Sequence, residues 1–531
     1  MTRTSAAKVC IKLSAFIFLL AESACSPYVR YQDDNPAPKP KPVPAFETAH
    51  EAVQAMGVGW NLGNTLDTWW TGDSDGRDWK KWETGWGQPV TKPELMTMLR
   101  QAGFGAVRVP VTWSVHMDSE GNVYPEWMDR VNEIVDYVLD AGLYCIINVH
   151  HDTGADEGVW LVASEADYQR EREMYEGLWI QIAERFGDYD QRLLFEAYNE
   201  MLDESRSWCF ASLNLGYDQA AAAEAYDAIN SYAQSFVDAV RSTGGNNAVR
   251  NLIVNTYGAC NGAGDWNPHL KEPLKNMNLP LDSTEGHLIF QVHAYPLIDD
   301  IPSMEAEVED MFDSLDRYLA SQGAPVIIGE WGTFSENPPK ENLLYFADFF
   351  VRNARKHCFG TFYWMTLTDG FARSVPAFSE PELARTIVEA YHGEGFSAVF
   401  PSMDEKDFKY SVTFNSQWSE MNLYDGKFSL DEYVGVRFSL EEAPDAGDLH
   451  VKVYGESEGK EQFGPVQGKD VTVMFDPSEV GSECSRVTLQ YTRNTSCQAT
   501  VSDVAMICPD GSVRKVIPSV FWGCYMEPIS L

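Results

Sequence analysis

Basic residues are scarce in this sequence. It has 40 Lys and Arg against 79 Asp and Glu, which gives a formal net charge of −39 at pH 7. Binding to nucleic acid needs a basic surface, so this deficit argues against a nucleic-acid partner. A neutral polymer such as a polysaccharide remains compatible with the charge. The 16 Trp and 24 Tyr suit that ligand, because sugar rings stack on aromatic faces, although most aromatic side chains fill cores.

Metal-binding and nucleotide-binding patterns are also lacking. The ten Cys include no C-x-x-C pair, so no zinc site is indicated. No glycine-rich phosphate loop follows any predicted strand, which counts against a nucleotide-binding open sheet. We therefore expect neither a metal nor a cofactor. Four Cys near the C-terminus permit three disulfide pairings, among which the sequence does not choose: Cys484, Cys497, Cys508 and Cys524.

One apolar run outside the predicted fold lies at the N-terminus. A basic segment precedes Leu13–Ala21 and small residues follow it, so residues 1–24 are predicted to be a signal peptide. Cys25 comes next, and the segment resembles the lipobox of bacterial lipoproteins, in which this Cys is acylated. Regularly spaced Pro residues predict that residues 25–45 form an extended tether. We expect an exported lipoprotein of the bacterial outer membrane or cell surface, with ordinary secretion as the alternative.

The middle of the chain alternates short apolar runs with helical patterns. Strands that are apolar on both faces and separated by helices indicate a parallel sheet covered by helices. Eight such units predict an α/β fold, a (β/α)8 TIM barrel over residues 46–398. The predicted strands are Val58–Leu62, Ala106–Val111, Tyr144–Val149, Leu193–Tyr198, Leu252–Thr256, Leu288–His293, Val326–Gly329 and Thr361–Met365.

The pattern changes after about residue 400, where five alternating segments without a helical pattern predict a second, all-β domain. We expect a β-sandwich over residues 405–531. Its size and position resemble those of carbohydrate-binding modules, although a spacer is also possible. The aromatic residues that could stack on sugars, or instead fill its core, are Trp418, Tyr424, Tyr433 and Trp522.

Two glutamates follow the predicted strands of the barrel. Glu200 comes at the end of the fourth strand and Glu330 at the end of the seventh, so we expect them to face each other across the barrel mouth. Two carboxyl groups about 5–5.5 Å apart perform retaining glycoside hydrolysis. One must be ionised and the other protonated, which requires environments that push their pKa values apart.

Further polar and aromatic side chains lie at the ends of neighbouring strands. Arg108 near Glu330 would favour the carboxylate form, and Tyr295 could donate a hydrogen bond to it. Asn199 could bind a sugar hydroxyl, and Trp364 could form the floor of the sugar site. The predicted substrate-binding and orienting residues are Asn61, Arg108, His150, His151, Asn199, His293, Tyr295 and Trp364.

A metal hydrolase is the rival interpretation, because His150, His151 and Asp152 are possible ligands. Adjacent residues of a strand point to opposite faces, whereas a pair sharing one metal is expected at i and i+2. This spacing argues against a metal site.

Five motifs within residues 48–395 resemble those of glycoside hydrolase family 5 and appear in the family's order. They are GWNLGNTLD at 59–67, ETGWG at 83–87, VRVPVTW at 107–113, FEAYNE at 195–200 and IGE at 328–330. The resemblance implies a retaining barrel enzyme without a catalytic metal. It also implies that Glu200 is the acid/base and Glu330 the nucleophile. The family's other site residues match Arg108, His150, Asn199, His293, Tyr295 and Trp364.

The branch most similar to this chain contains endo-β-1,4-glucanases, xyloglucanases and lichenases. We therefore expect a monomeric, endo-acting hydrolase of plant-type β-1,4-glucan: cellulose-type chains, xyloglucan or mixed-linkage glucan. A β-mannanase with the same chemistry is one alternative. A non-catalytic glycan-binding surface lipoprotein is another, and the intact pair Glu200 and Glu330 argues against it.

Overall fold

A computed structural model describes residues 45–70, 75–156, 158–206, 218–264, 267–403, 409–441, 447–457 and 459–529. The predicted signal peptide, Cys25 and all of the predicted tether except Ala45 lie outside these residues. Within the described ranges, no helix has both the length and the apolar character needed to cross a membrane.

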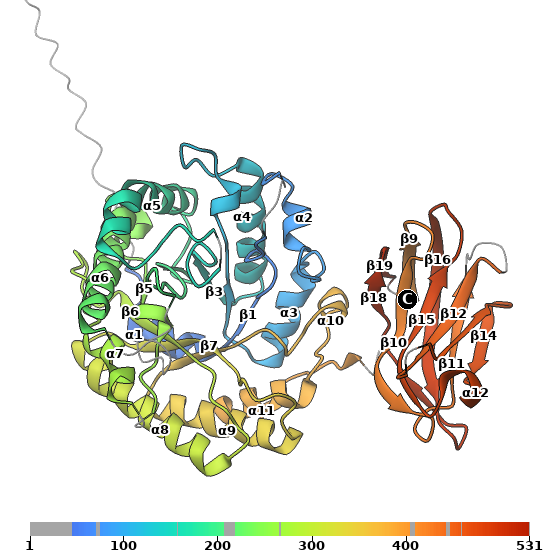
Figure 1. Cartoon of the computed structure of the whole chain (residues 1–531). Coiled ribbons are helices and arrows are strands. Elements are labelled where there is room, and N and C mark those ends of the chain that lie inside the picture. The colour runs from blue at the N-terminus through green and yellow to red at the C-terminus, as the bar shows by residue number, and fades with distance from the viewer. Residues whose placement is uncertain are drawn as a thin grey trace, which may run out of the picture. The chain divides into compact units, whose positions relative to one another are not determined.

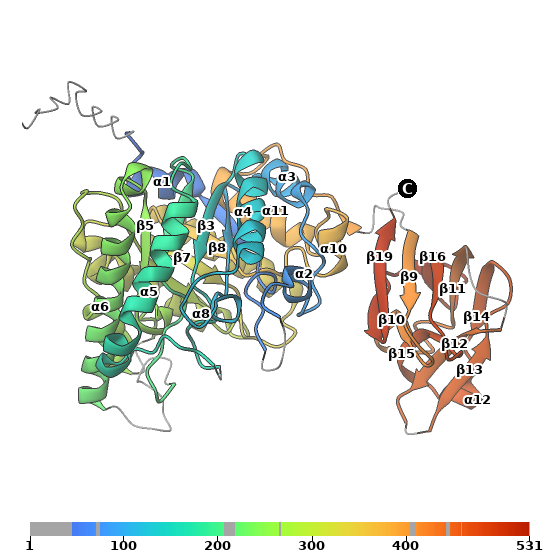
Figure 2. The same cartoon turned by 90° about the horizontal axis from the view of Figure 1, so that it is seen from above.

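Eight parallel strands close into a barrel in the order β1 to β8, as the sequence predicts. Figure 1 shows the helices as a ring around these strands, and the view from above shows strands and helices lying alongside one another (Figure 2). The strands are β1 (Val58–Asn61), β2 (Ala106–Val109), β3 (Tyr144–Asn148), β4 (Leu193–Glu196), β5 (Leu252–Asn255), β6 (Leu288–Ala294), β7 (Val326–Trp331) and β8 (Gly360–Tyr363).

A helix follows each of these strands along the chain, and α1 precedes β1. Thr48 caps α1 in a reciprocal capping box with Glu51. Short helices α2 (Trp79–Glu83) and α10 (Phe371–Ser374) lie in loops. The remaining helices of the barrel are α1 (Ala49–Met56), α3 (Pro93–Ala102), α4 (Pro125–Asp140), α5 (Glu165–Arg185), α6 (Gln219–Ser242), α7 (Glu272–Lys275), α8 (Ile301–Tyr318), α9 (Lys340–Lys356) and α11 (Pro381–His392).

The inside of the barrel begins with an apolar layer. β1 contributes Gly59 instead of a side chain, since a Cβ there would lie 2.3 Å from the ring of Phe362. Residues of α1 pack against the same layer, so this helix closes one end of the barrel. Each other strand contributes one buried residue to it: Ala106, Ile146, Leu194, Ile253, Ile289, Ile327 and Phe362.

The C-terminal region is an antiparallel β-sandwich, as predicted. One sheet has the order β13-β12-β15-β10-β18, and the other has the order β14-β11-β16-β9-β19, with β17 paired to β16. The strands are β9 (Lys409–Phe414), β10 (Glu420–Ser429), β11 (Gly435–Glu441), β12 (Leu449–Gly455), β13 (Glu461–Pro465), β14 (Asp470–Met474), β15 (Glu483–Tyr491), β16 (Cys497–Ile507), β17 (Val513–Lys515), β18 (Ser519–Trp522) and β19 (Cys524–Ile529). A short helix, α12 (Pro477–Val480), lies between β14 and β15.

The four aromatic candidates of the sandwich divide into two pairs. Tyr433 is only 2% exposed, and Tyr424 packs against it and against Phe428, so both contribute to the core, the second of the two roles that the sequence leaves open. Trp418 and Trp522 are 49% and 57% exposed. The four C-terminal Cys are free thiols.

Candidate active site

A polar layer lies directly above the apolar layer inside the barrel. Side chains alternate along a strand, so the residue two positions after an interior residue also points inward. Six strands place a fully buried polar side chain at that position: Asn61, Arg108, Asn148, Glu196, Asn255 and Gln291. A barrel needs only apolar side chains to fill its interior, so this layer is built for another purpose.

Arg108 is the centre of the layer. Its Nε and Nη2 donate to the two carboxylate oxygens of Glu196 at 2.7 and 2.8 Å. Nη1 donates to Glu330 Oε1 at 2.8 Å and to Asn61 Oδ1 at 3.0 Å, and Nη2 also donates to Asn199 Oδ1 at 2.8 Å. Burial alone would lower the pKa of Arg108, but Glu196 and Glu330 raise it above its ordinary value, so the guanidinium stays charged.

Glu196 is a buried carboxylate that the sequence analysis did not assign to the site. Burial favours its protonated form, but the charge and hydrogen bonds of Arg108 outweigh that effect and lower the pKa. Asn148 Nδ2 also donates to Glu196 Oε1 at 3.0 Å. Glu196, held by Asn148, therefore fixes the position of the Arg108 guanidinium. The guanidinium in turn fixes the position of Glu330. The missed residues Glu196, Asn148 and Asn255 share one signal, namely their place two residues beyond an apolar interior residue.

A β-bulge directs Glu330 into the barrel mouth. Ile327 belongs to the inner apolar layer, so strict alternation would turn Glu330 outward. The pairing of β6 with β7 shifts between Val292 and His293, whose partners are Ile328 and Glu330, so Gly329 is the extra residue. A Cβ at Gly329 would lie 2.3 Å from the side chain of Gln291, so a larger residue does not fit the bulge.

Each oxygen of the Glu330 carboxyl group has a donor. Arg108 holds Oε1, and the Tyr295 hydroxyl donates to Oε2 at 2.7 Å. His293 Nδ1 lies 3.6 Å from the same Oε2. Burial raises the pKa of Glu330, and His293, Arg108 and Tyr295 oppose this rise. Arg108 thus acts in the predicted direction, although burial has the larger effect.

Glu200 occupies a different environment, four residues past the end of β4. Its Oε1 lies 2.7 Å from His293 Nδ1, and its side chain is 21% exposed. Burial raises the pKa of Glu200 to about 7, more than the charges of Arg108 and His151 lower it. Burial also lowers the pKa of His293 to about 4, so this ring is neutral at pH 7. One carboxylate oxygen of Glu200 and one of Glu330 lie within 4.8 Å of each other.

The hydrogen bonds of Asn148 determine which nitrogen of His150 carries the proton. The backbone N–H of Val111 donates to Asn148 Oδ1 at 3.0 Å, so the amide Nδ2 is the atom 3.0 Å from His150 Nδ1. That ring nitrogen must accept, which places the proton of the neutral imidazole on Nε2. Nε2 lies 4.0 Å from Glu330 Oε1. His150 therefore presents a hydrogen-bond donor beside the two glutamates.

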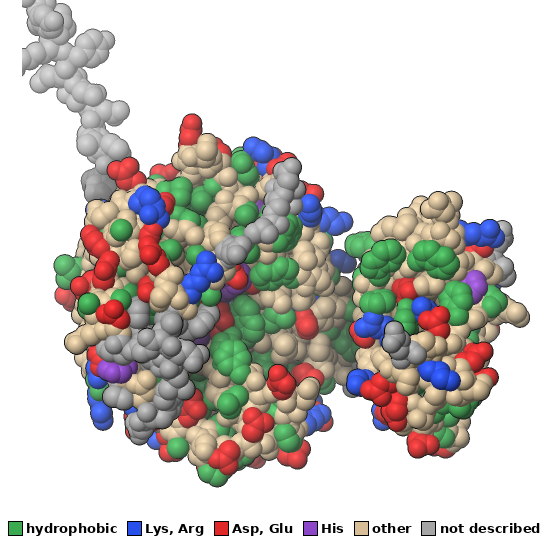
Figure 3. Space-filling view, viewed as in Figure 1, with side chains coloured by type: hydrophobic (Ala, Val, Ile, Leu, Met, Phe, Trp, Pro, Cys, Tyr) green, Lys and Arg blue, Asp and Glu red, His purple; other side chains and the backbone are tan. Residues whose placement is uncertain are grey.

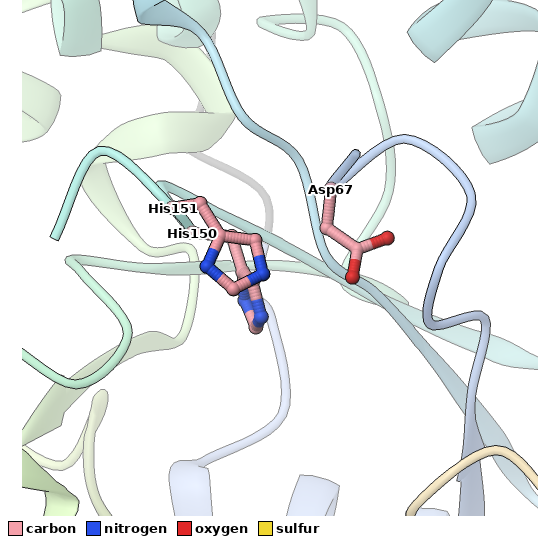
Figure 4. Close-up of side chains that lie close together, drawn as sticks. All are labelled: Asp67, His150 and His151. Carbon is pink, nitrogen blue, oxygen red and sulfur yellow. The ribbon is translucent and has the colours of Figure 1, made fainter. Parts of the chain in front are cut away.

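His150 and His151 lie closer together than the sequence analysis predicted. β3 ends at Asn148, so strand alternation does not apply to them, and the argument from opposite faces is wrong. Their ring nitrogens and a carboxylate oxygen of Asp67 lie within 4.8 Å of one another (Figure 4). The proton on His150 Nε2 and the backbone N–H groups of Asn64 and Thr65, which donate to Asp67, favour hydrogen bonding over metal ligation here.

Two further predicted residues border the site. The half-buried Trp364 ring is nearly parallel to that of His150, with centroids 6.0 Å apart. Gly63 leaves room for this indole, because a Cβ there would lie 2.9 Å from it. His151 contacts the edge of Trp86, which is 38% exposed, and so lies farther toward the outside. All ten predicted residues therefore belong to one region at the mouth of the barrel.

Known proteins show the same barrel. The family model "Cellulase (glycosyl hydrolase family 5)" matches residues 70–368. An endoglucanase A of Clostridium longisporum is 33% identical over 333 residues, which span 60% of this chain and 60% of that enzyme. An endoglucanase B of Ruminococcus albus is 32% identical over 61% of this chain and 74% of its own length. The family match ends before the sandwich begins.

Solved structures agree with this match. A GH5-4 broad-specificity endoglucanase from an uncultured bacterium is 51% identical, with a TM-score of 0.62, and the alignment covers 66% of this chain and 97% of that one. A family 5 enzyme of Prevotella bryantii B14, solved with a xyloglucan tetradecasaccharide, is 43% identical with a TM-score of 0.59, over 66% of this chain and 99% of that one.

Proposed function

The chain belongs to glycosyl hydrolase family 5, the cellulase family, and on this premise we propose that it cleaves β-1,4-glucan backbones internally with retention of configuration. The observation that carries the proposal is the pair Glu200 and Glu330. One oxygen of each carboxyl group lies within 4.8 Å of the other, which fits the short separation of retaining enzymes, about 5–5.5 Å, rather than that of inverting ones.

Glu330 is the proposed nucleophile. Arg108 and Tyr295 hold its two oxygens, so the carboxylate is oriented before substrate arrives. It attacks the anomeric carbon, the bond to the leaving oxygen breaks, and a covalent glycosyl-enzyme forms. Glu330 is the glutamate of the pair in contact with a guanidinium, so it ionises first.

Glu200 is the proposed acid and base. Its raised pKa, about 7, lets it hold a proton at mildly acidic pH and give that proton to the leaving glycosidic oxygen. It then takes a proton from the water that cleaves the glycosyl-enzyme, which restores both carboxyl groups. The rate should therefore fall as the pH rises past about 7.

The orienting residues would bind the sugar beside the reacting carbon. The oxygen of the Asn199 side chain accepts from Arg108, so its Nδ2 is the group that can donate to a sugar hydroxyl. His150 offers Nε2–H, and Trp364 offers a ring face. Together these groups offer two hydrogen-bond donors and one stacking surface to a sugar ring.

The substrate class rests on relatives. Solved relatives carry a xyloglucan tetradecasaccharide or cellotriose, and another is a lichenase of Caldicellulosiruptor. For this chain we expect cleavage of cellulose-type, xyloglucan or mixed-linkage chains. Product analysis on these polymers and on glucomannan tests the choice, and proton NMR of the first products tests retention, which requires the β-anomer to appear before mutarotation. Inverted products, or cleavage of mannan alone, would contradict the proposal.

We also propose that the protein is exported and anchored to a membrane by a lipid on Cys25. This proposal rests on the N-terminal sequence alone. Incorporation of labelled palmitate into the wild-type protein, but not into Cys25→Ser, is the expected result. Release of unlabelled wild-type protein into the medium would contradict anchoring.

A further inference from the structure

The outer face of the sheet β13-β12-β15-β10-β18 is unlike an ordinary solvated strand surface. The inward residues Met421, Leu489 and Val451 are paired across three strands and belong to the core. Their neighbours Glu420, Gln490 and His450 are paired in the next row and therefore point outward. Trp522 of β18 is paired with Glu420 and extends this outward row.

Polar side chains at the centre of this face are buried and preorganised. Glu420, only 7% exposed, accepts hydrogen bonds from the Tyr454 hydroxyl at 2.7 Å and the Thr488 hydroxyl at 2.8 Å. The Gln490 amide also donates to it. Such an arrangement is costly to build on a surface that only contacts water.

Asn422, in the row beside Glu420, has an unmet hydrogen-bonding need. It is 2% exposed, and its Nδ2 donates to Asp425 and to Ser519. Within the described part of the chain its Oδ1 has no partner, and neither has Nδ1 of His450 on the same face. Buried polar atoms are normally satisfied, so these two leave hydrogen-bonding capacity unused beneath this face.

Exposed aromatic rings surround this polar centre. Trp522, Phe521 and Phe463 are 57%, 42% and 43% exposed, with the first two on edge strand β18 and the third on edge strand β13. The Arg486 guanidinium lies 3.9 Å from the centroid of the Phe521 ring. In Figure 3, hydrophobic and charged side chains lie side by side on the face of the sandwich that is turned to the viewer.

Trp418, two residues before β10, is a strained aromatic residue beside this sheet. It is 49% exposed and has a φ of 71°, a left-handed conformation that a bulky residue rarely adopts. Its N–H donates to the carbonyl of Tyr491 on the neighbouring strand. A half-exposed Trp that keeps a strained backbone is a candidate for a functional role.

We propose that this face, bordered by Trp418, Phe521, Trp522 and Phe463, binds a neutral β-glucan chain laid across the strands. A sugar ring has apolar C–H faces, which stack on aromatic rings, and a rim of hydroxyls, which can hydrogen-bond to polar side chains of the face. Five strands about 4.8 Å apart give a face roughly 19 Å wide, enough for several sugar rings. The choice of a glucan rests on the proposed function of the barrel. The net charge of −39 disfavours a strongly anionic polymer.

The test uses the full chain carrying Glu330→Gln, so that polymer is not cleaved. Trp522→Ala and Trp418→Ala are added separately, and retardation is measured in native gels containing xyloglucan, mixed-linkage glucan or hydroxyethylcellulose. Tyr525→Ala is the matched control, because this aromatic residue is 46% exposed and lies on the other sheet. We expect the apparent affinity to fall about tenfold for each Trp variant, the loss typical of truncating an aromatic anchor, and not for the control.

Two results would overturn the inference. One is unchanged retardation for both Trp variants. The other is a parent dimer in light scattering that Trp522→Ala converts to a monomer without any change in retardation, because the face would then bind a second copy. In the otherwise wild-type enzyme, Trp522→Ala should cleave short oligosaccharides normally. The wild-type enzyme could also cleave no glucan and yet show a retardation that Trp522→Ala abolishes. The proposed function would then be wrong, whereas the proposed binding face would be confirmed.

Discussion

The barrel mouth and the outer face of the sandwich both combine polar and aromatic side chains, but they differ in how these are exposed. At the mouth, Arg108 and Glu196 are fully buried, and Arg108 contacts four side chains through hydrogen bonds of 2.7–3.0 Å. On the sandwich, Trp522 and Trp418 are about half exposed.

The difference follows from what each region must do. Bond cleavage needs charges that are fixed before the substrate arrives, because reorganisation would add to the barrier. Polymer binding needs only ring faces that a chain can reach. Substitutions at the mouth should therefore lower the rate on every substrate, whereas substitutions on the sandwich face should matter only for long chains.

The largest effect is expected for Glu330→Ala. Without this carboxylate no glycosyl-enzyme forms, so turnover should fall roughly 10⁵-fold on short and long substrates alike. Reducing-end release measures the rate, and thermal unfolding checks that the barrel is intact. Glu336→Ala is the matched control, since Glu336 is exposed on the loop after β7. Substantial activity of Glu330→Ala would show that another group attacks the anomeric carbon.

Glu200→Ala should have a smaller effect that depends on the leaving group. General acid catalysis contributes about 10²–10⁴-fold, so cleavage of polymer should fall by that factor. Aryl glycosides with acidic phenol leaving groups need no proton, so the variant should still form the glycosyl-enzyme faster from them than from polymer. This step is seen as a burst of phenol. Equal losses on polymer and aryl glycoside would contradict the acid/base assignment.

Asn148→Asp tests whether the hydrogen bonds at the barrel mouth, and not only its packing, are needed for activity. The carboxylate keeps the acceptor for Val111 N–H but can no longer donate to His150 Nδ1 or to Glu196 Oε1. The imidazole proton should therefore move from Nε2 to Nδ1, where the new carboxylate accepts it. We expect kcat/KM to fall roughly 10²-fold, as is typical when positioning is lost. Nitrogen-15 NMR of the histidine ring reports the tautomer directly, with His150→Gln to assign the signal. An unchanged tautomer with full activity would overturn this role.

The sequence predicts the barrel well because its signals are local. All eight strands occur where apolar runs are bounded by turns, and the polar layer follows from counting two residues past Ile146, Leu194 or Ile253. The same count would have identified Asn148, Glu196 and Asn255.

Other features depend on contacts between distant segments and are not visible in local patterns. The count from Ile327 points Glu330 outward, and only the bulge at Gly329, formed against β6, reverses it. In the sandwich, the five predicted segments correspond to β11, β12, β14, β15 and β16, and the other six strands were not predicted. In β10, buried polar residues such as Glu420 and Asn422 interrupt the apolar alternation. Those interruptions mark the proposed binding face.

The last prediction concerns stability at the two regions. The pKa of Glu200 is raised from 4.5 to about 7, so between these values the folded state binds more protons than the unfolded state. The contribution of Glu200 to the free energy of unfolding therefore decreases as the pH rises through that window. Above about pH 7 the carboxyl group is ionised in both states, and the destabilisation by its burial is complete.

Glu200→Gln removes this cost, because its amide cannot ionise but can still bond to His293. We expect the variant to match the wild type below about pH 4.5 and to exceed its stability by up to about 3 kcal/mol at pH 8. Urea unfolding at pH 4.5, 6 and 8 measures the difference. Trp522→Ala, on the sandwich, should change stability by the same amount at each pH, because no titrating group there is affected. A Glu200→Gln effect that did not grow with pH would mean that the ionised carboxylate is not destabilised by burial at the mouth.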